Sequence, residues 1–183
     1  MATPDSSGPL SLGFLTILQE PTGYVGGYLV TNVWGRPLEF RLSTAVQPNR
    51  VQQVLYAHTL GGYVCGELIG KTLFDKTGTP AQVVLTDTYD AFNLRRCVDV
   101  PVVWVAPVTD PRAAELAEQG AVVRPAAGGR GPLLAHPDYP DDRPRLRELF
   151  ERLSGLDVVE PFARIREAVA EARKMGVTQR AAG

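Results

Sequence analysis

The chain has 183 residues, of which 44% are hydrophobic and 21% are charged, and its formal net charge is −1. This composition is typical of an ordinary soluble globular protein. The near-zero charge gives no long-range attraction to nucleic acid or anionic membranes. No apolar run approaches the ~20 residues of a membrane helix, and the first residues contain no secretory apolar segment, so we expect a cytoplasmic protein.

The first 46 residues predict a three-stranded antiparallel meander preceded by a tail. Residues 1–11 are small and polar and include two prolines, so we expect them to be disordered. Strands are expected over residues 12–20, 26–32 and 38–46 because β-favouring apolar runs are separated there by glycine-containing turns.

Helices and buried strands then alternate up to residue 125. The spacing of Val51, Val54, Leu55 and His58 predicts a helix over 48–60 that turns these side chains, His58 included, toward the core. Gly61 and Gly62 are expected to interrupt the helical pattern. The later elements are helices over 63–78, 88–98 and 110–120 and strands over 81–87, 100–107 and 121–125. They predict an α/β domain with a mixed sheet over 12–123.

The segment after residue 123 has a different composition. Residues 124–143 are rich in proline and glycine and predict a linker. Residues 144–183 predict two amphipathic helices, each with one apolar stripe. The stripes consist of Leu146, Leu149, Phe150 and Leu153 in the first helix and of Phe162, Ile165 and Val169 in the second. Because such stripes must be buried, we expect this arm to be the main association surface and the domain over 12–123 to fold without it.

The stretch CGELIGKT, residues 65–72, ends like a phosphate-binding loop. Such a loop requires glycine where Cys65 stands, a buried strand before it and a helix after it. Here Val64, Leu68 and Ile69 instead form a helical stripe through the motif. Backbone amides inside a helix are already hydrogen-bonded, so we expect no nucleotide site and a solvated Lys71.

The order of the elements resembles the ribonuclease H-like fold over about residues 12–120. The stretches GGYLV and GRPLEF resemble that fold's second and third strands, PNRVQQVLYA resembles the opening of its first helix, and VVLTDTYDAF resembles its fourth strand. The resemblance implies a sheet that starts with an antiparallel meander and continues with helix, strand, helix and strand. It also implies a cluster of carboxylates that holds two divalent metal ions, Mg²⁺ or Mn²⁺, for phosphodiester cleavage.

The carboxylates that the resemblance implies are only partly present. Asp87 matches the aspartate at the end of the fourth strand, and Glu20 is the only acid on the first strand. Gln52 or Gln53 stands where the first helix should carry a glutamate, and an amide supplies no negative charge for a hard cation. The late acid could be Asp110, Glu115 or Glu118. Asp87 could alternatively cap the helix that follows it.

Three further groups of side chains are candidate sites. The stretch HPDYPDD, residues 136–142, has one histidine and three carboxylates, but its prolines favour a solvated turn over a metal site. Arg95 and Arg96 either touch phosphate or cap a helix end. Tyr24, Tyr28, Trp34 and Tyr63 either pack between strands or form a stacking surface for nucleic acid or protein.

Two functions follow from these observations. The first is a non-catalytic α/β binding or scaffold module that acts through protein–protein contacts, with a protein partner or a second copy and without a cofactor. The alternative is a metal-dependent nuclease of ribonuclease H-like type, with Glu20 and Asp87 as catalytic residues and Mg²⁺ or Mn²⁺ as cofactor. The incomplete carboxylate set and the near-neutral charge favour the first. Nucleic acid is a possible partner, but the charge does not indicate it.

Overall fold

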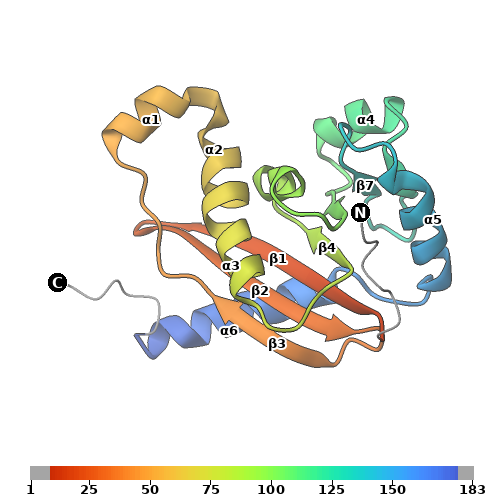
Figure 1. Cartoon of the computed structure of the whole chain (residues 1–183), viewed down its shortest axis with the longest axis horizontal. Coiled ribbons are helices and arrows are strands. Elements are labelled where there is room, and N and C mark those ends of the chain that lie inside the picture. The colour runs from red at the N-terminus through yellow and green to blue at the C-terminus, as the bar shows by residue number, and fades with distance from the viewer. Residues whose placement is uncertain (1–8, 177–183) are drawn as a thin grey trace.

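Seven strands form one mixed sheet in the order β3-β2-β1-β4-β5-β7-β6, in a computed structural model that describes residues 9–176 (Figure 1). The strands are β1 (Ser11–Glu20), β2 (Gly23–Asn32), β3 (Pro37–Leu42), β4 (Val83–Thr86), β5 (Val102–Val105), β6 (Val122–Arg124) and β7 (Leu133–Ala135). Most of the predicted tail lies outside the described residues, and its last residue, Ser11, already belongs to β1.

The first five strands have the predicted topology. β1 pairs antiparallel with β2, and β2 pairs antiparallel with β3, which forms the meander. β4 lies parallel to β1, and β5 lies parallel to β4. Each parallel step requires a crossover, and helical segments supply both of them. The α/β class and the mixed sheet predicted from the sequence are therefore confirmed.

The predicted linker over 124–143 contains a strand of the sheet. Its residues Leu133, Leu134 and Ala135 form β7, which pairs antiparallel with both β5 and β6. All three side chains are fully buried. Three apolar residues among prolines and glycines are too few to show a strand period, so composition suggested a loop where the chain returns to the sheet.

Helices cover both faces of the sheet, as Figure 1 shows. In chain order they are α1 (Arg50–Tyr56), η1 (Ala57–Thr59), α2 (Leu60–Gly62), η2 (Tyr63–Gly70), α3 (Lys71–Lys76), η3 (Tyr89–Arg96), α4 (Pro111–Glu118), α5 (Asp142–Arg152) and α6 (Glu160–Lys174). None of these described helices is long and apolar enough to cross a membrane.

The segment from α1 to α3 is one bent helix. Ala57, with a φ of 45°, is the only described non-glycine residue in the left-handed region, and α1 is set at an angle to the rest there (Figure 1). Gly61 and Gly62 do not interrupt the helix, contrary to expectation. They lie where η3 comes close, and a Cβ at Gly62 would stand 1.9 Å from Nδ2 of Asn93. The glycines therefore serve helix packing.

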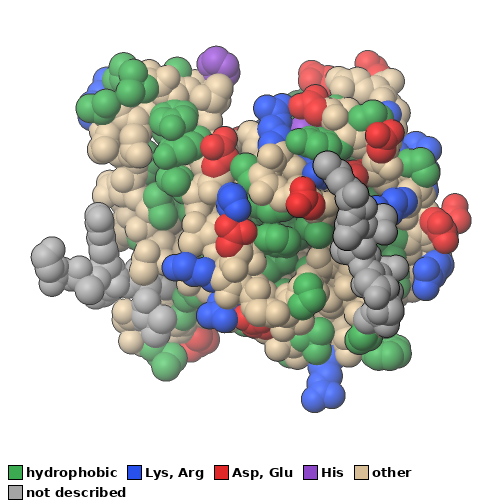
Figure 2. All heavy atoms as spheres, in the orientation of Figure 1, with side chains coloured by type: hydrophobic (Ala, Val, Ile, Leu, Met, Phe, Trp, Pro, Cys, Tyr) green, Lys and Arg blue, Asp and Glu red, His purple; other side chains and the backbone are tan. Residues whose placement is uncertain are grey.

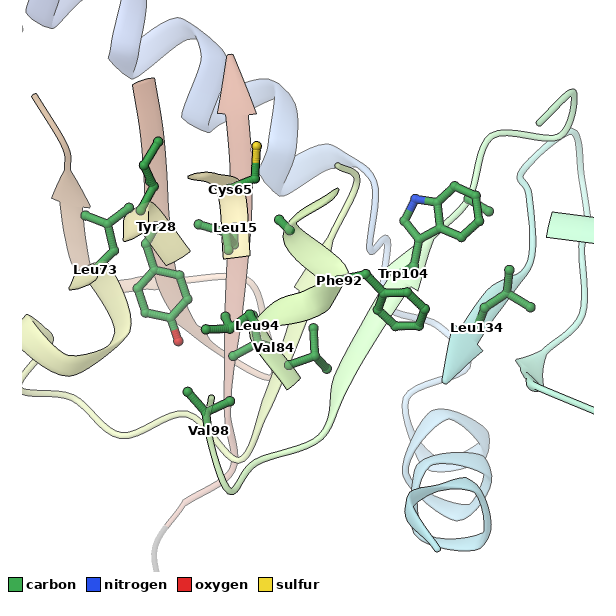
Figure 3. Close-up of a cluster of buried hydrophobic side chains, with 14 of the residues drawn as sticks. Leu15, Tyr28, Cys65, Leu73, Val84, Phe92, Leu94, Val98, Trp104 and Leu134 are labelled. Atoms are coloured by element: carbon green, nitrogen blue, oxygen red, sulfur yellow. The ribbon is translucent and has the colours of Figure 1, made fainter. Parts of the chain in front are cut away.

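Two apolar cores lie on opposite faces of the sheet. On one face η2, α3, η3 and α4 contribute to a cluster around Tyr28 and Trp104 (Figure 3). On the other face α5 and α6 pack on Phe14, Leu29 and Val103. A sheet buried on both faces explains the continuous apolar runs of β4 and β5.

Candidate functional site

The motif CGELIGKT lies inside the bent helix, as predicted. Residues 63–70 form the π-helical segment η2, and the backbone N–H of Lys71 donates to the carbonyl of Gly66 five residues earlier. The Lys71 side chain is partly exposed at the helix surface and pairs with Asp75 at 2.6 Å. The backbone amides of this stretch are engaged within the helix, so they do not form a phosphate cradle.

Asp87 is held by two other elements. Its Oδ1 accepts a hydrogen bond from Oγ1 of Thr16 on β1 at 2.6 Å, and its Oδ2 is paired with Arg166 of α6. Thr88, not Asp87, precedes η3 as its N-cap. The capping interpretation of Asp87 is therefore wrong, because its carboxylate points to β1 and α6.

Glu20 is paired separately, with Arg173 of α6 at 2.7 Å. The register pairs Leu15 with Thr86, so Thr16 lies beside Asp87 and Glu20 lies four residues further along β1. Four residues of a strand span about 13 Å. The two arginine partners lie seven residues apart on α6, which is about 10 Å along a helix. The two carboxylates therefore contact α6 at two separate positions along the helix.

The implied pair of metal ions does not fit these residues. Ions that share carboxylates in a two-metal site stand about 4 Å apart, well below the separation of Glu20 and Asp87. The glutamine at the expected glutamate position, Gln52, instead forms a capping box with Asn49. Asp110 caps α4 and pairs with Arg112. Within residues 9–176 no group of three or more His, Cys, Asp or Glu side chains could hold a metal ion.

The stretch HPDYPDD is not a solvated turn throughout. His136 is buried at the end of β7, and burial lowers the pKa of its imidazole to about 4. Asp142, also buried, receives two hydrogen bonds from Arg95, at 2.7 and 3.2 Å. Asp138 pairs with Arg96 at 2.6 Å. The two arginines of η3 thus fasten this stretch to η3.

The two C-terminal stripes are buried by the chain's own sheet. The fully buried members are Leu146, Phe150, Phe162, Ile165 and Val169, whereas Leu149 and Leu153 are partly buried. The ring of Phe162 meets that of Phe14 edge-on, with centroids 5.6 Å apart. Gly27 of β2 lets α6 approach closely, because a Cβ there would stand 2.4 Å from Cγ2 of Ile165. An association role for these stripes would require α5 and α6 to leave the sheet.

The apolar face predicted to point into the core from the first helix is exposed. Val51, Val54 and Leu55 are 65%, 62% and 75% exposed, and none of the seven residues of α1 is buried by the described chain. His58 is exposed as well, so its expected core position is wrong. Figure 2 shows hydrophobic side chains gathered over this projecting end. We call Val51, Val54 and Leu55 the α1 ridge.

The four aromatic residues of the candidate stacking surface do not gather on one face. Tyr28 is buried in the core, whereas Trp34 is 85% exposed in the turn between β2 and β3. Tyr63 stacks on Tyr56 of α1, with ring centroids 4.0 Å apart. Of the candidate surfaces, the α1 ridge has the most large apolar side chains side by side on one element.

The sequence was compared with known proteins. No protein-family model matches it, and no curated protein matches it. The function is therefore inferred from the geometry of the chain itself.

Proposed function

We propose that this protein is a non-catalytic α/β assembly module that binds through protein–protein contacts made by the α1 ridge. The observation that carries the proposal is the exposure of Val51, Val54 and Leu55 on a helix without a buried residue. Their spacing of three and four residues aligns them on one helix face. An amphipathic helix that offers such a row to a partner is a common mode of protein recognition.

The α1 helix gains little stabilisation from its own chain. Helices shorter than about 12–15 residues are marginal in water, and most helical stability in proteins comes from tertiary packing. α1 has seven residues, and its described support is the capping box of Asn49 and Gln52 and the stacking of Tyr56 on Tyr63. A partner that covers the ridge would supply the missing packing.

We propose a second copy of the chain as the partner. Residues 42–66 contain a single charged side chain, Arg50. A twofold contact places the same patch of both copies face to face, so a ridge almost free of charge meets no like-charge repulsion from its own copy. A short helix offers less area than the ~800 Å² per partner of a standard interface, so we expect a weak dimer in the micromolar range.

The ribonuclease H-like assignment is also a proposal. It is supported by the strand order β3-β2-β1-β4-β5, with an antiparallel meander followed by two parallel strands. The nuclease alternative has less support, because Glu20 and Asp87 pair with separate arginines. The nuclease alternative stays a prediction. A manganese-dependent cleavage activity that is lost in both Glu20→Gln and Asp87→Asn would favour it.

The assembly proposal is tested by sedimentation velocity over a concentration series. We expect the wild-type chain to shift from monomer toward dimer as its concentration rises, and Leu55→Glu to remain monomeric, because the dimer would bury two added carboxylates. The matched control is Val108→Glu, at a valine 61% exposed outside α1. A wild-type chain that stays monomeric to about 1 mM, or a Leu55→Glu chain that dimerises normally, would contradict the proposal.

A further inference from the structure

A second candidate site is a pocket of about 280 Å³ between the bent helix and η3. We call it the histidine pocket, because it contains both histidines of the chain. Figure 2 shows the notch at this position, between the projecting end and the rest of the molecule. Its lining includes His136, Asp90, Asn93, Phe92, Leu116 and Arg96. The volume lies just below the ~300–1,000 Å³ of typical ligand pockets, so a bound molecule would be small.

His136 offers a hydrogen-bond donor to this pocket. It is 3% exposed, and burial keeps its imidazole neutral at pH 7, since its pKa is lowered to about 4. The backbone N–H of Asp138 donates to Nδ1 at 3.3 Å. A neutral imidazole that accepts at Nδ1 has its hydrogen on Nε2. None of the hydrogen bonds within the described chain uses this Nε2–H.

Asp90 and Asn93 of η3 offer acceptors to the same pocket. They are set against Gly61 and Gly62: a Cβ at Gly61 would stand 2.3 Å from Oδ2 of Asp90, and one at Gly62 would stand 1.9 Å from Nδ2 of Asn93. The two glycines therefore make the room in which these side chains lie. Neither side chain hydrogen-bonds to another described side chain or backbone group. An ionised carboxylate accepts only, whereas an amide both donates and accepts.

The other lining residues include two apolar side chains and one arginine that is already paired. Phe92 and Leu116 are 4% and 7% exposed and present flat or branched hydrocarbon to the pocket. Arg96 is the one arginine in the lining, and it is paired with Asp138 at 2.6 Å. An anion such as phosphate would therefore meet the Asp90 carboxylate without a free guanidinium to balance it.

We propose that the histidine pocket binds a small uncharged heteroaromatic ring whose edge has both N–H donors and a carbonyl or ring-nitrogen acceptor, as a nucleobase has. The donors of the ring match the Asp90 carboxylate and the Asn93 carbonyl. The acceptor matches Nε2–H of His136 or the Asn93 amide. The faces of the ring match Phe92 and Leu116. Asp90 is exposed and Asn93 partly buried, whereas His136 is buried, so a ring without such an edge would leave the Nε2–H of His136 without a partner and should bind more weakly.

Trp104 provides a reporter for binding. Its ring centroid lies 4.9 Å from that of Tyr89 and 6.4 Å from that of Phe92, and both of these residues line the pocket. The chain has two tryptophans, so Trp34→Phe leaves Trp104 as the single one. The full chain with this substitution is titrated with adenosine, cytidine, uridine and, separately, inorganic phosphate, and is read by tryptophan fluorescence and ¹H–¹⁵N NMR.

We expect at least one nucleoside to bind saturably and to shift the amide signals of η3 residues. We expect no binding of inorganic phosphate. Asp90→Asn removes an acceptor-only group at nearly constant size and should weaken binding about tenfold or more. The control is Asp99→Asn, at an exposed aspartate outside the pocket, which should bind as before. Gly62→Ala, which displaces Asn93, should abolish binding.

Saturable binding by none of the nucleosides, equal binding in Asp90→Asn, or binding of phosphate alone would overturn the proposal. Leu55→Glu should bind normally, so this result is independent of the α1 ridge.

Discussion

The helices α1 and α6 have similar apolar patterns and opposite environments. Each has large apolar side chains three and four residues apart, Val51, Val54 and Leu55 in α1 and Phe162, Ile165 and Val169 in α6. In α6 these side chains are 1% exposed, and in α1 they are 62–75% exposed. The sequence suggested the reverse, with the first helix in the core and the last on a mobile arm. An apolar stripe shows that a helix face needs burial, but not what buries it.

The difference comes from what lies opposite each helix. α6 follows β1 and β2, where Gly27 leaves room for Ile165 and where Arg166 and Arg173 reach the acids Asp87 and Glu20. α1 turns away from the helix axis at Ala57, which carries it beyond the sheet. The acids Asp87 and Glu20 lie 79 and 153 positions before their arginine partners on α6, so a local pattern does not contain these contacts.

Phe162→Ala should have the largest effect on stability. Its ring is fully buried between α6 and Phe14. Truncation of a buried phenylalanine costs about 3–5 kcal/mol, from lost burial and the cavity left behind. We expect this loss in the free energy of unfolding, measured by urea denaturation with circular dichroism. Met175→Ala, at an exposed residue just after α6, is the control. A change below about 1 kcal/mol for Phe162→Ala would show that α6 is dispensable.

The same burial gives a prediction for truncated chains. Removal of residues 144–183 would expose the face of the sheet that α5 and α6 cover. We expect the remaining chain to lose its cooperative unfolding transition, whereas sequence patterns suggested that residues 12–123 fold alone. A truncated chain with a sharp urea transition and native circular dichroism would restore the view of α5 and α6 as an arm.

His136 should make stability depend on pH. Its pKa is about 4 in the folded chain and 6.5 in its ordinary state, because burial disfavours the charged imidazole. As the pH falls, the unfolded chain therefore binds a proton at this histidine before the folded chain does. The free energy of unfolding is highest above pH 6.5 and decreases as the pH falls toward 4, by at most about 3 kcal/mol from this residue. The nearby charges are the pairs Arg95–Asp142 and Arg96–Asp138.

The measurement compares urea midpoints of the wild-type chain and of His136→Gln from pH 7 to pH 4. Each chain is referred to its own value at pH 7, which removes any constant cost of the substitution. A smaller decline in His136→Gln is expected. In addition, the ¹H–¹⁵N imidazole signals of His136 should titrate near pH 4. They are identified by their absence in His136→Gln. Identical declines in both chains would contradict the buried, neutral imidazole.

The contact between Asp87 and Arg166 should have an intermediate effect. Asp87→Asn weakens a half-buried carboxylate's bonds to Thr16 and Arg166, and loss of a hydrogen bond to a charged group costs about 1–3 kcal/mol. Arg166 is about half exposed, so its ion pair with Asp87 contributes less to stability than the buried hydrogen bond does. In a double-mutant cycle with Arg166→Ala we expect a coupling of about 0.5–1 kcal/mol. Additive effects would show that the pair does not hold α6 in place.

The sequence predicted the elements better than their partners. β4 and β5 were found because continuous apolar runs of β-favouring residues indicate strands buried on both faces. β7 was missed because three residues are too few to show a period. The partner of Asp87 was missed because Arg166 lies 79 positions away. Gly61 and Gly62 suggested a break, since a local pattern does not show that η3 packs against them.

Leu55→Ala should have the smallest effect on the free energy of unfolding of the monomer, and it completes the comparison with Phe162→Ala. Leu55 is 75% exposed, so its truncation removes little buried surface and leaves no cavity. Surface substitutions of this kind usually change stability by less than about 0.5 kcal/mol, and alanine favours the helix slightly. Urea denaturation at a low protein concentration, where the chain is monomeric, measures this value. At a high concentration, where we propose a dimer, the same substitution should lower the apparent stability more, because association adds to the stability of the folded state. A loss above about 1 kcal/mol at low concentration would mean that α1 folds back onto its own chain, and it would remove the contrast between the two helices.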